Sequence, residues 1–303
     1  MFFSPPVHLI PPVYRPPSEA NSLLVQVTIG CSNNKCTYCD MYRSKEFKVR
    51  KTDEIIKDLK SSAYFYKSNG VTPRRIFLCD GDALGAPMET LVSTLEAINS
   101  LFPSLDRVGI YATAANMLEK TEEELKTLAK LKLTMAYLGL ESGSDQVLHM
   151  IVKGNTANDM VVGSSKIQNA GIKLSTIVML GVGGKEHSKE HVAQTIRVLN
   201  QSPPNYFSFL TTFSVPGTPY DKMVKRGLIK PLTSKELLVE MKNILEGLDL
   251  EAHKKIIFRA NHVSNQFPIG GILPRDKKKI LSTLETWIKQ TPEGIFPPKP
   301  PTM

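Results

Sequence analysis

The sequence lacks features that would place it in several broad classes of protein. No apolar run approaches the roughly 18 residues that a membrane-crossing helix needs, and the proline-rich stretch 1–17 has no apolar segment typical of a signal peptide. Only four of the 303 residues are cysteine, and they are too clustered for the disulfide framework of a secreted domain. With 41% hydrophobic and 22% charged residues, the composition also excludes a disordered chain. We therefore expect a globular, cytoplasmic protein that does not act in a membrane.

The sequence has no excess of acidic residues, and its excess of basic residues lies toward the C-terminal end. The formal net charge is +9, and residues 203–303 contain 15 Lys and Arg against 9 Asp and Glu. The basic residues form two groups, one of Lys254, Lys255 and Arg259 and one of Arg275 and Lys277–Lys279. Such groups can bind phosphates, RNA or another anionic substrate, and they are also typical of a solvated helix face. The sequence leaves both interpretations open.

Three of the four cysteines, Cys31, Cys36 and Cys39, fall within nine residues. Three thiolates this close together can bind one metal ion or cluster. A structural zinc site needs a closed set of four ligands, and the sequence has no second Cys-x2-Cys pair to complete one. Cys79 lies in an expected buried strand, where cysteine usually acts as a small apolar residue. A [4Fe-4S] cluster held by three thiolates would leave one iron open to a substrate or cofactor, and we favour this interpretation.

Short runs that are apolar on both faces alternate with longer segments of helical period. Apolarity on both faces is typical of parallel strands covered by helices. The expected strands are Leu24–Gly30, Arg75–Cys79, Val108–Ala112, Met135–Leu140, Leu174–Leu180 and Tyr206–Thr212. The expected helices are 52–69, 87–101, 121–131, 156–170, 188–201, 234–248 and 275–288. Capping boxes, in which two side chains satisfy amides at a helix start, are predicted at Thr121 with Glu124 and at Thr233 with Glu236.

Six βα units with right-handed crossovers can form an open sheet or a barrel, and periodicity does not decide between the two. We expect an extended proline-rich segment over 1–20, a βα core over 21–220, an extension packed on it over 221–290, and a proline-rich tail over 291–303. In the extension, Ile256–Phe258 is a short apolar stretch and Gly270–Gly271 is expected to be a loop.

The cysteine segment resembles the hallmark of the radical SAM superfamily, and the resemblance covers roughly residues 15–220. That family places Cys-x3-Cys-x2-Cys after the first strand of a partial (β/α)6 barrel, with an aromatic residue before the last cysteine. Here Tyr38 takes the aromatic place, and four residues separate Cys31 from Cys36. The resemblance implies an α/β fold, a partial (β/α)6 TIM-like barrel with an α-rich C-terminal extension.

Further motifs follow the second and fourth expected strands. Asp80–Asp82, with Gly81 in the middle, is similar to the segment that holds the methionine amino group of S-adenosylmethionine (SAM), although Asp80 replaces a glycine. Glu141 and Ser142, followed by Lys153, are similar to the branch that contains coproporphyrinogen oxidases, methylthiotransferases and an Elongator subunit. The resemblance implies that Glu141 faces the SAM ribose or methionine and that Lys153 pairs with the SAM carboxylate. Alternatively, the aspartates cap a helix and Lys153 is an ordinary surface lysine.

Two later segments complete the comparison with this branch. The glycine run that begins at Gly181 is similar to a loop beside the SAM adenine, and Pro216–Pro219 after the sixth strand is typical of the branch. Glycine runs alone also form turns of no function. A polar segment after Ile256–Phe258 is a candidate for substrate contact through Arg259, Asn261, His262 and Asn265. His187 and His191 have no cysteine or carboxylate at zinc spacing, so we expect surface residues.

The resemblance implies a radical enzyme. A [4Fe-4S] cluster on Cys31, Cys36 and Cys39 would reductively cleave SAM to a 5′-deoxyadenosyl radical that abstracts hydrogen from an unidentified substrate. An electron donor such as flavodoxin or ferredoxin is implied, and the substrate is open, with an anionic molecule or RNA as candidates. Two alternatives remain: an RNA-binding protein stabilised by a metal or cluster, and a radical SAM enzyme that modifies tRNA.

Overall fold

The computed structural model describes residues 7–251 and 255–300, and it divides the chain into two compact units. Lys254 and the ends of the two proline-rich segments lie outside the described residues. Unit 1 comprises Met1–Asn34, Met41–Leu138 and Ser165–Leu174; unit 2 comprises Lys35–Asp40, Gly139–Ser164 and Ser175–Met303. Within the described ranges, no helix combines the length and the apolar composition that a membrane span requires.

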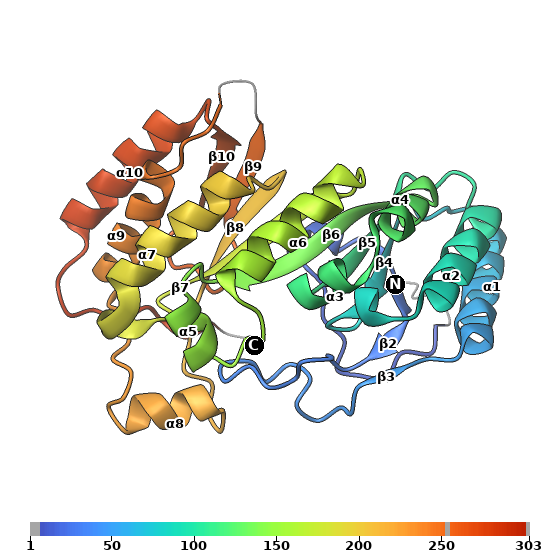
Figure 1. Cartoon of the computed structure of the whole chain (residues 1–303), viewed down its shortest axis with the longest axis horizontal. Helices are drawn as coiled ribbons and strands as arrows, with labels where there is room; N and C mark the ends of the chain where they lie inside the picture. The colour runs from blue at the N-terminus through green and yellow to red at the C-terminus, as the bar shows by residue number, and fades with distance from the viewer. Residues whose placement is uncertain (1–6, 252–254, 301–303) are drawn as a thin grey trace. The chain divides into compact units, whose positions relative to one another are not determined.

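Unit 1 is built on parallel strands with buried, β-branched and aromatic side chains. In register, Val25 lies opposite Leu78, and Leu78 lies opposite Ile110. The strands are β1 (Leu23–Gln26), β4 (Arg75–Cys79), β5 (Arg107–Ala112) and the first part of β6 (Leu133–Glu141). The helices are α1 (Thr52–Ser68), α2 (Met88–Leu101), α3 (Ala114–Glu119) and α4 (Glu122–Lys130). Figure 1 shows α1 and α2 side by side, and these helices contact each other.

The helices of unit 1 form where apolar side chains recur at helical spacing. On α2, Leu91, Leu95 and Ile98 are fully buried and share one face. At the start of α4, Thr121 and Glu124 make the reciprocal hydrogen bonds of the predicted capping box. A second small sheet pairs β2 (Thr28–Ile29) with β3 (Lys48–Val49).

Unit 2 continues the alternation of strands and helices. Its strands are the main part of β7 (Lys173–Leu180), β8 (Tyr206–Thr211), β9 (Ile256–Ala260) and β10 (Ile269–Leu273). Its helices include α5 (Asp145–Met150), α7 (Gly184–Gln201), α8 (Pro219–Lys225), α9 (Ser234–Glu246) and α10 (Lys277–Gln290). Helix α6 (Ala157–Asn169) belongs to both units. The rings of Phe207, Phe209 and Phe258 pack together in the core, with centroids 4.7–5.7 Å apart.

The larger sheet has eight strands in the order β1-β4-β5-β6-β7-β8-β9-β10. Each strand pairing described for it is parallel except that of β9 with β10. Helices follow β4, β5, β6, β7 and β8, so the predicted α/β alternation is confirmed. In such folds, ligands bind at the carboxyl ends of the strands.

The structure corrects several expected elements. The stretch Leu24–Gly30 is not one strand, because Val27 leaves the ladder and bonds to Cys79 and Arg50 before β2 begins. The expected loop at Gly270–Gly271 lies inside β10, so the extension adds strands as well as helices. At Gly271 a Cβ atom would lie 2.9 Å from the Cβ of Asp276, which shows that glycine allows a close approach there. The short helices α3, α5 and α8 were not predicted.

Candidate functional site

The three clustered cysteines lie in the irregular segment that follows β2. Cys31 belongs to unit 1, whereas Cys36 and Cys39 belong to the Lys35–Asp40 segment of unit 2, and all three are partly exposed. Three thiol donors on one short loop match the chemistry of a [4Fe-4S] ligand set. Among the described residues, no three His, Cys, Asp or Glu side chains form a ready metal group. Cys79 is fully buried, and burial raises the pKa of its thiol, as expected for a structural cysteine.

Backbone hydrogen bonds anchor the Lys35–Asp40 segment inside unit 2. The Thr37 amide donates to the Ile151 carbonyl at 2.9 Å, and the Tyr220 amide donates to the Thr37 carbonyl at 3.0 Å. The Cys39 amide donates to the Cys36 carbonyl at 3.3 Å and closes a turn. The two cysteines are therefore held between the end of α5 and the start of α8.

Glu141 lies at the carboxyl end of β6 and pairs with two residues of the predicted site. Its Oε1 accepts hydrogen bonds from the Tyr38 hydroxyl at 2.8 Å and from Lys153 Nζ at 2.9 Å. Burial and the neighbouring carboxylate raise the pKa of Tyr38. Glu141 has a φ of +61°, in the left-handed region that non-glycine residues rarely adopt, which is typical of functional sites. A buried carboxylate at this position needs a partner, and Lys153 supplies a positive charge.

Gly139 leaves the space that this ion pair occupies. A Cβ atom on Gly139 would overlap Glu141 Oε1 and would lie 3.0 Å from Lys153 Nζ. Any larger residue at 139 therefore displaces the carboxylate. The Glu141–Lys153 pair therefore requires glycine at position 139.

Asp80 is fully buried and is paired within unit 1. Its Oδ2 accepts from Lys45 Nζ at 2.7 Å, from Gln26 Nε2 at 2.9 Å and from the Gly30 amide at 3.0 Å. None of these is a helix-capping contact. Lys45 neutralises the charge of Asp80. The hydrogen bond from the Gly30 amide to Asp80 joins the start of the cysteine loop to the end of β4.

Asp82 has a different environment. Its Oδ2 accepts hydrogen bonds from Ser32, Asn116 and Thr113, whereas its Oδ1, like that of Asp80, is buried without a hydrogen-bond partner among the described residues. Burial raises the pKa of this carboxyl, although the hydrogen bonds from Ser32, Asn116 and Thr113 oppose the rise. A buried carboxylate oxygen of this kind would be stabilised by a bound cationic group. Next to it, Gly81 has no room for a side chain, because a Cβ atom would lie 2.7 Å from the Tyr42 ring.

The remaining residues of the predicted cofactor site are buried. Ser142 is fully buried, and its hydroxyl lies 2.8 Å from His191 Nδ1. Gly181 follows β7 with a φ of +75°. The prediction that His191 is a surface residue is wrong, because its side chain is fully buried. His191 and its neighbour Glu240 are thus residues that sequence reasoning missed, and no local signal marks them, because the two lie 49 residues apart in the sequence.

The four residues expected to contact substrate occupy separate places in unit 2. Arg259 and Asn261 line an open groove of about 480 Å³ beside β10, with Arg275 and Asp276. His262 is half-buried and bonds to Ser264.

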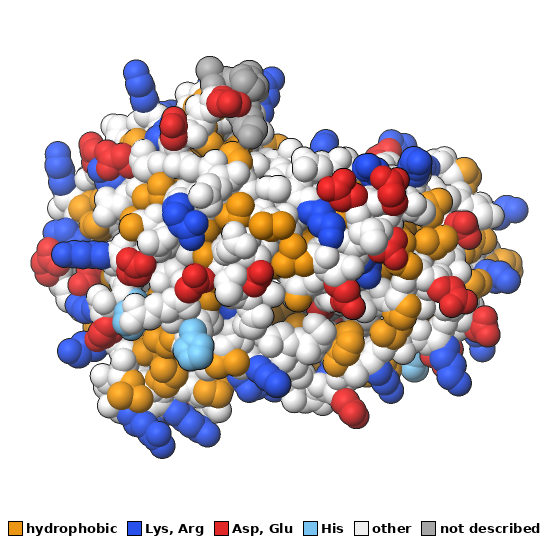
Figure 2. Space-filling view, viewed as in Figure 1, with side chains coloured by type: hydrophobic (Ala, Val, Ile, Leu, Met, Phe, Trp, Pro, Cys, Tyr) orange, Lys and Arg blue, Asp and Glu red, His pale blue; other side chains and the backbone are white. Residues whose placement is uncertain are grey.

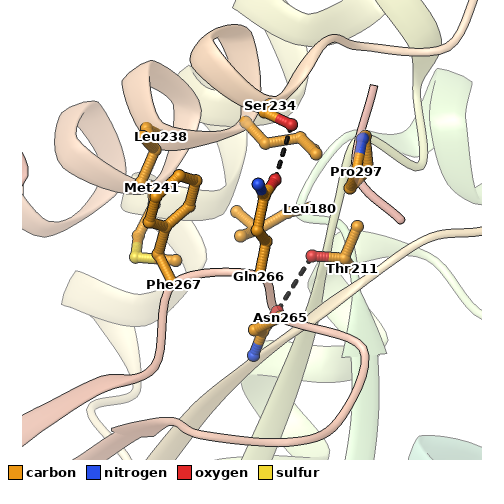
Figure 3. Close-up of a pocket in the computed structure, with 10 residues that line it drawn as sticks. Leu180, Thr211, Ser234, Leu238, Met241, Asn265, Gln266, Phe267 and Pro297 are labelled. Carbon is orange, nitrogen blue, oxygen red and sulfur yellow. Dashed lines mark hydrogen bonds between the residues drawn. The ribbon is translucent and has the colours of Figure 1, made fainter. Parts of the chain in front are cut away.

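Asn265 lies in a different place, at the carboxyl ends of β7 and β8. It accepts a hydrogen bond from the Thr211 hydroxyl at 2.9 Å and lines a small cavity of about 20 Å³, and Figure 3 shows Gln266 and Pro297 among the other residues that line it. A cavity of this size has room for roughly one water molecule.

Comparisons with known proteins give one family match and several distant relatives. A family model described as the radical SAM superfamily matches residues 25–199. A tRNA uridine(34) acetyltransferase of Methanocaldococcus jannaschii is 23% identical over 39% of this chain and 22% of its own length. A tRNA-2-methylthio-N(6)-dimethylallyladenosine synthase of Cronobacter sakazakii is 24% identical over 69% of this chain and 44% of its own length. The chain thus spans less than half the length of these two relatives.

The fold is shared with solved structures. The Methanocaldococcus infernus Elp3 structure covers 89% of this chain and 63% of its own chain, with a TM-score of 0.52 and 14% sequence identity. At this identity the match shows the fold, a partial barrel of βα units. The predicted fold class is therefore confirmed.

Proposed function

The chain belongs to the radical SAM superfamily, and we propose that it is an enzyme that generates a radical from SAM and uses it on a substrate. The [4Fe-4S] cluster and SAM of this family supply the chemistry, which is the reductive formation of a 5′-deoxyadenosyl radical that abstracts hydrogen. Cys31, Cys36 and Cys39 would be the cluster ligands, and their three thiolates would leave one iron open for SAM. An electron donor such as flavodoxin or ferredoxin and a cytoplasmic location, where thiols stay reduced, belong to the same proposal.

The buried Oδ1 of Asp82 is the observation that carries the proposal. Among the described residues this oxygen has no hydrogen-bond partner, and Asp82, unlike Asp80, has no ion-pair partner there either, so the positively charged α-ammonium group of SAM would supply the missing partner. In unit 2, Tyr38, Glu141 and Lys153 form a polar group beside the cysteine segment, which would orient the ribose or the methionine carboxylate. Gly81, Ser142 and Gly181 would shape the surroundings. Asp80, with its partner Lys45, supports the loop.

An anaerobic assay tests the proposal directly. We expect that the protein, reconstituted with iron and sulfide and reduced with dithionite, converts SAM to 5′-deoxyadenosine and methionine. The electron paramagnetic resonance spectrum of the cluster should change when SAM is added, because SAM binds the open iron. A fully loaded cluster that gives neither the spectral change nor 5′-deoxyadenosine would contradict the proposal.

RNA is the substrate class that a specific observation favours. Both relatives named above act on tRNA by their names, and Lys278 and Lys279 are exposed on α10. Lys277 is different, because it donates to the Glu246 and Leu248 carbonyls, and burial lowers its pKa. On the face drawn in Figure 2, Lys and Arg are interspersed with Asp and Glu. This face therefore shows no continuous basic patch.

We expect tRNA binding that weakens linearly on a log-log plot against salt, with a slope near −0.9 for each phosphate contacted. The double variant Lys278→Gln with Lys279→Gln should lower the magnitude of this slope by about two. The matched double variant Lys57→Gln with Lys60→Gln removes the same charge from exposed positions of α1 and should leave the slope unchanged. Equal slopes in all three proteins would reject an RNA contact at α10.

A further inference from the structure

Side chains from α8 and α9 hold the loop that follows β7. Glu240 of α9 accepts a hydrogen bond from the Gly181 amide at 2.6 Å and another from Ser188. Tyr220 of α8 donates its hydroxyl to the Gly181 and Val182 carbonyls, at 3.3 and 3.1 Å. Both the amide and the carbonyl of Gly181 are thus bound by residues that lie beyond the family match, which ends at residue 199.

Packing against α9 fixes the same loop. Gly181 has a φ of +75°, and a Cβ atom on it would lie 2.9 Å from Leu237 Cδ2 of α9. Helix α9 also contacts α7, and Figure 1 shows α7, α9 and α10 gathered in unit 2. The conformation of the loop is therefore set by contacts with the C-terminal part of the chain as well as by its own glycines.

His191 of α7 lies between Glu240 and the end of β6, and its hydrogen bond is to Ser142, because Nε2 makes none with the described residues. Its Nδ1 lies 2.8 Å from the Ser142 hydroxyl, and its Nε2 lies 3.6 Å from Glu240 Oε1. The Ser142 oxygen already accepts from the Ser144 amide at 3.1 Å, so its own proton is free to bond to Nδ1. We therefore assign the ring proton to Nε2, where it faces the carboxylate. Burial lowers the pKa of His191, which favours the neutral ring.

A serine, a histidine and a carboxylate in a row resemble the catalytic triad of hydrolases. Burial excludes that role here, since Ser142 and His191 are 0% exposed and Glu240 is 2% exposed. A nucleophile without access to solvent or substrate does no chemistry on a bound molecule. Instead, His191 hydrogen-bonds to Ser142 at the end of β6, and Glu240 hydrogen-bonds to Gly181 at the end of β7.

We propose that Tyr220 and Glu240, with His191 packed beside Glu240, form a clamp that fixes the Gly181 loop in the conformation that binds SAM. The clamp makes SAM affinity depend on α8 and α9, which lie outside the segment matched by the family. Its members are positioning residues, because they act through the loop and do not touch the cofactor themselves. The inference rests on the proposed function, since it takes the Gly181 loop as part of the SAM site.

Glu240→Gln tests the clamp with little change in shape. A hydrogen bond to a charged acceptor is stronger than one to a neutral acceptor, so we expect amide exchange in a peptide that contains Gly181 to become at least tenfold faster. This measurement uses the full chain without cluster or SAM. In the reconstituted protein, we expect the dissociation constant of SAM to rise at least tenfold, with iron content and unfolding midpoint unchanged. Glu246→Gln, on the exposed face of the same helix, is the matched control. It should change neither the amide exchange rate at Gly181 nor the dissociation constant of SAM.

Tyr220→Phe is the second variant and decides the question if Glu240→Gln folds poorly. It removes one hydroxyl and should also speed exchange at Gly181 and weaken SAM binding, whereas Tyr64→Phe, on an exposed side chain of α1, should not. If wild-type protein binds SAM and the clamp variants bind it equally well, the inference is wrong. If wild-type protein carries a full cluster and binds no SAM, the proposed function is wrong and the inference falls with it.

Discussion

Replacing Cys36 with alanine is expected to abolish the iron-sulfur cluster and all SAM cleavage. With two thiolates left, half of the irons of a [4Fe-4S] cluster would lack a protein ligand, and a cluster bound by so few thiolates is lost. Cys36 is partly exposed in an irregular segment, so its truncation should change the free energy of unfolding by about 0.5 kcal/mol or less. The loss of function would therefore come from missing ligation and not from unfolding. The measurement is iron per chain and visible absorbance after anaerobic reconstitution, followed by the 5′-deoxyadenosine assay.

Cys79→Ala is the matched control for this prediction. Cys79 is fully buried in β4, and its thiol bonds to the Val25 carbonyl at 3.6 Å. Its removal leaves a small void and should destabilise the protein by roughly 1–2 kcal/mol, yet the cluster and SAM cleavage should remain. The opposite pattern, with the cluster retained in Cys36→Ala and lost in Cys79→Ala, would move the ligand role to Cys79.

The elements that the sequence predicts well are those whose signals are local. The strand Arg75–Cys79 has the predicted bounds, because it is one apolar run buried on both faces. The capping boxes at Thr121 and Thr233 are both present, because each depends on two residues three positions apart. Helix α8 was missed although Thr218 caps it, because seven residues are too few to show a helical period. The predicted loop at Gly270–Gly271 was wrong, because a glycine pair is typical of a turn and the sequence does not show the close neighbours that glycine allows here.

The predictions for the candidate site also succeed where the signal is local and fail where it is long-range. That Glu141 needs a partner follows from its place after an apolar run, and the structure supplies Tyr38 and Lys153. The partners of His191 lie 49 residues before and after it, so spacing within α7 could not reveal its burial. Long-range pairing of polar groups is decided by how helices pack on the sheet, which one sequence read alone does not specify.

Asp82→Asn is expected to weaken SAM binding by about a hundredfold, which corresponds to roughly 3 kcal/mol. Asparagine keeps an oxygen that can accept from Ser32, Asn116 and Thr113, but it carries no negative charge for the SAM ammonium. Hydrogen bonds to charged groups contribute about 1.5–3 kcal/mol, and charge attraction in a buried site adds to this. The measurement is SAM binding to the anaerobically reconstituted variant at unchanged cluster content.

The same substitution should not destabilise the protein in the absence of cofactors. The pH dependence of the free energy of unfolding shows the direction of its effect. Burial raises the pKa of Asp82 above its ordinary value of 3.8, so the folded state binds this proton more tightly than the unfolded state does. The contribution of Asp82 to stability is therefore complete below pH 3.8 and is lost as pH rises through the raised pKa. Asparagine does not ionise, so the free energy of unfolding of the variant relative to wild type should increase with pH above about 4 and then level off. Unfolding by denaturant across this range measures it.

Asp58→Asn separates this effect from the general cost of changing a carboxylate. Asp58 is also in unit 1 and pairs with Arg50 at 2.9 Å. Its replacement removes the nearer of the two carboxylates paired with the buried Arg50 guanidinium and leaves only Glu54, at 3.8 Å, so that variant should lose stability at neutral pH and keep SAM affinity. We expect the free energy of unfolding to change in opposite directions in the two variants. This result would mean that Asp82 is an ionisable residue kept at a cost in stability because a cation binds there. A loss of stability in Asp82→Asn with unchanged SAM affinity would instead assign Asp82 to the packing of α3 against the cysteine loop.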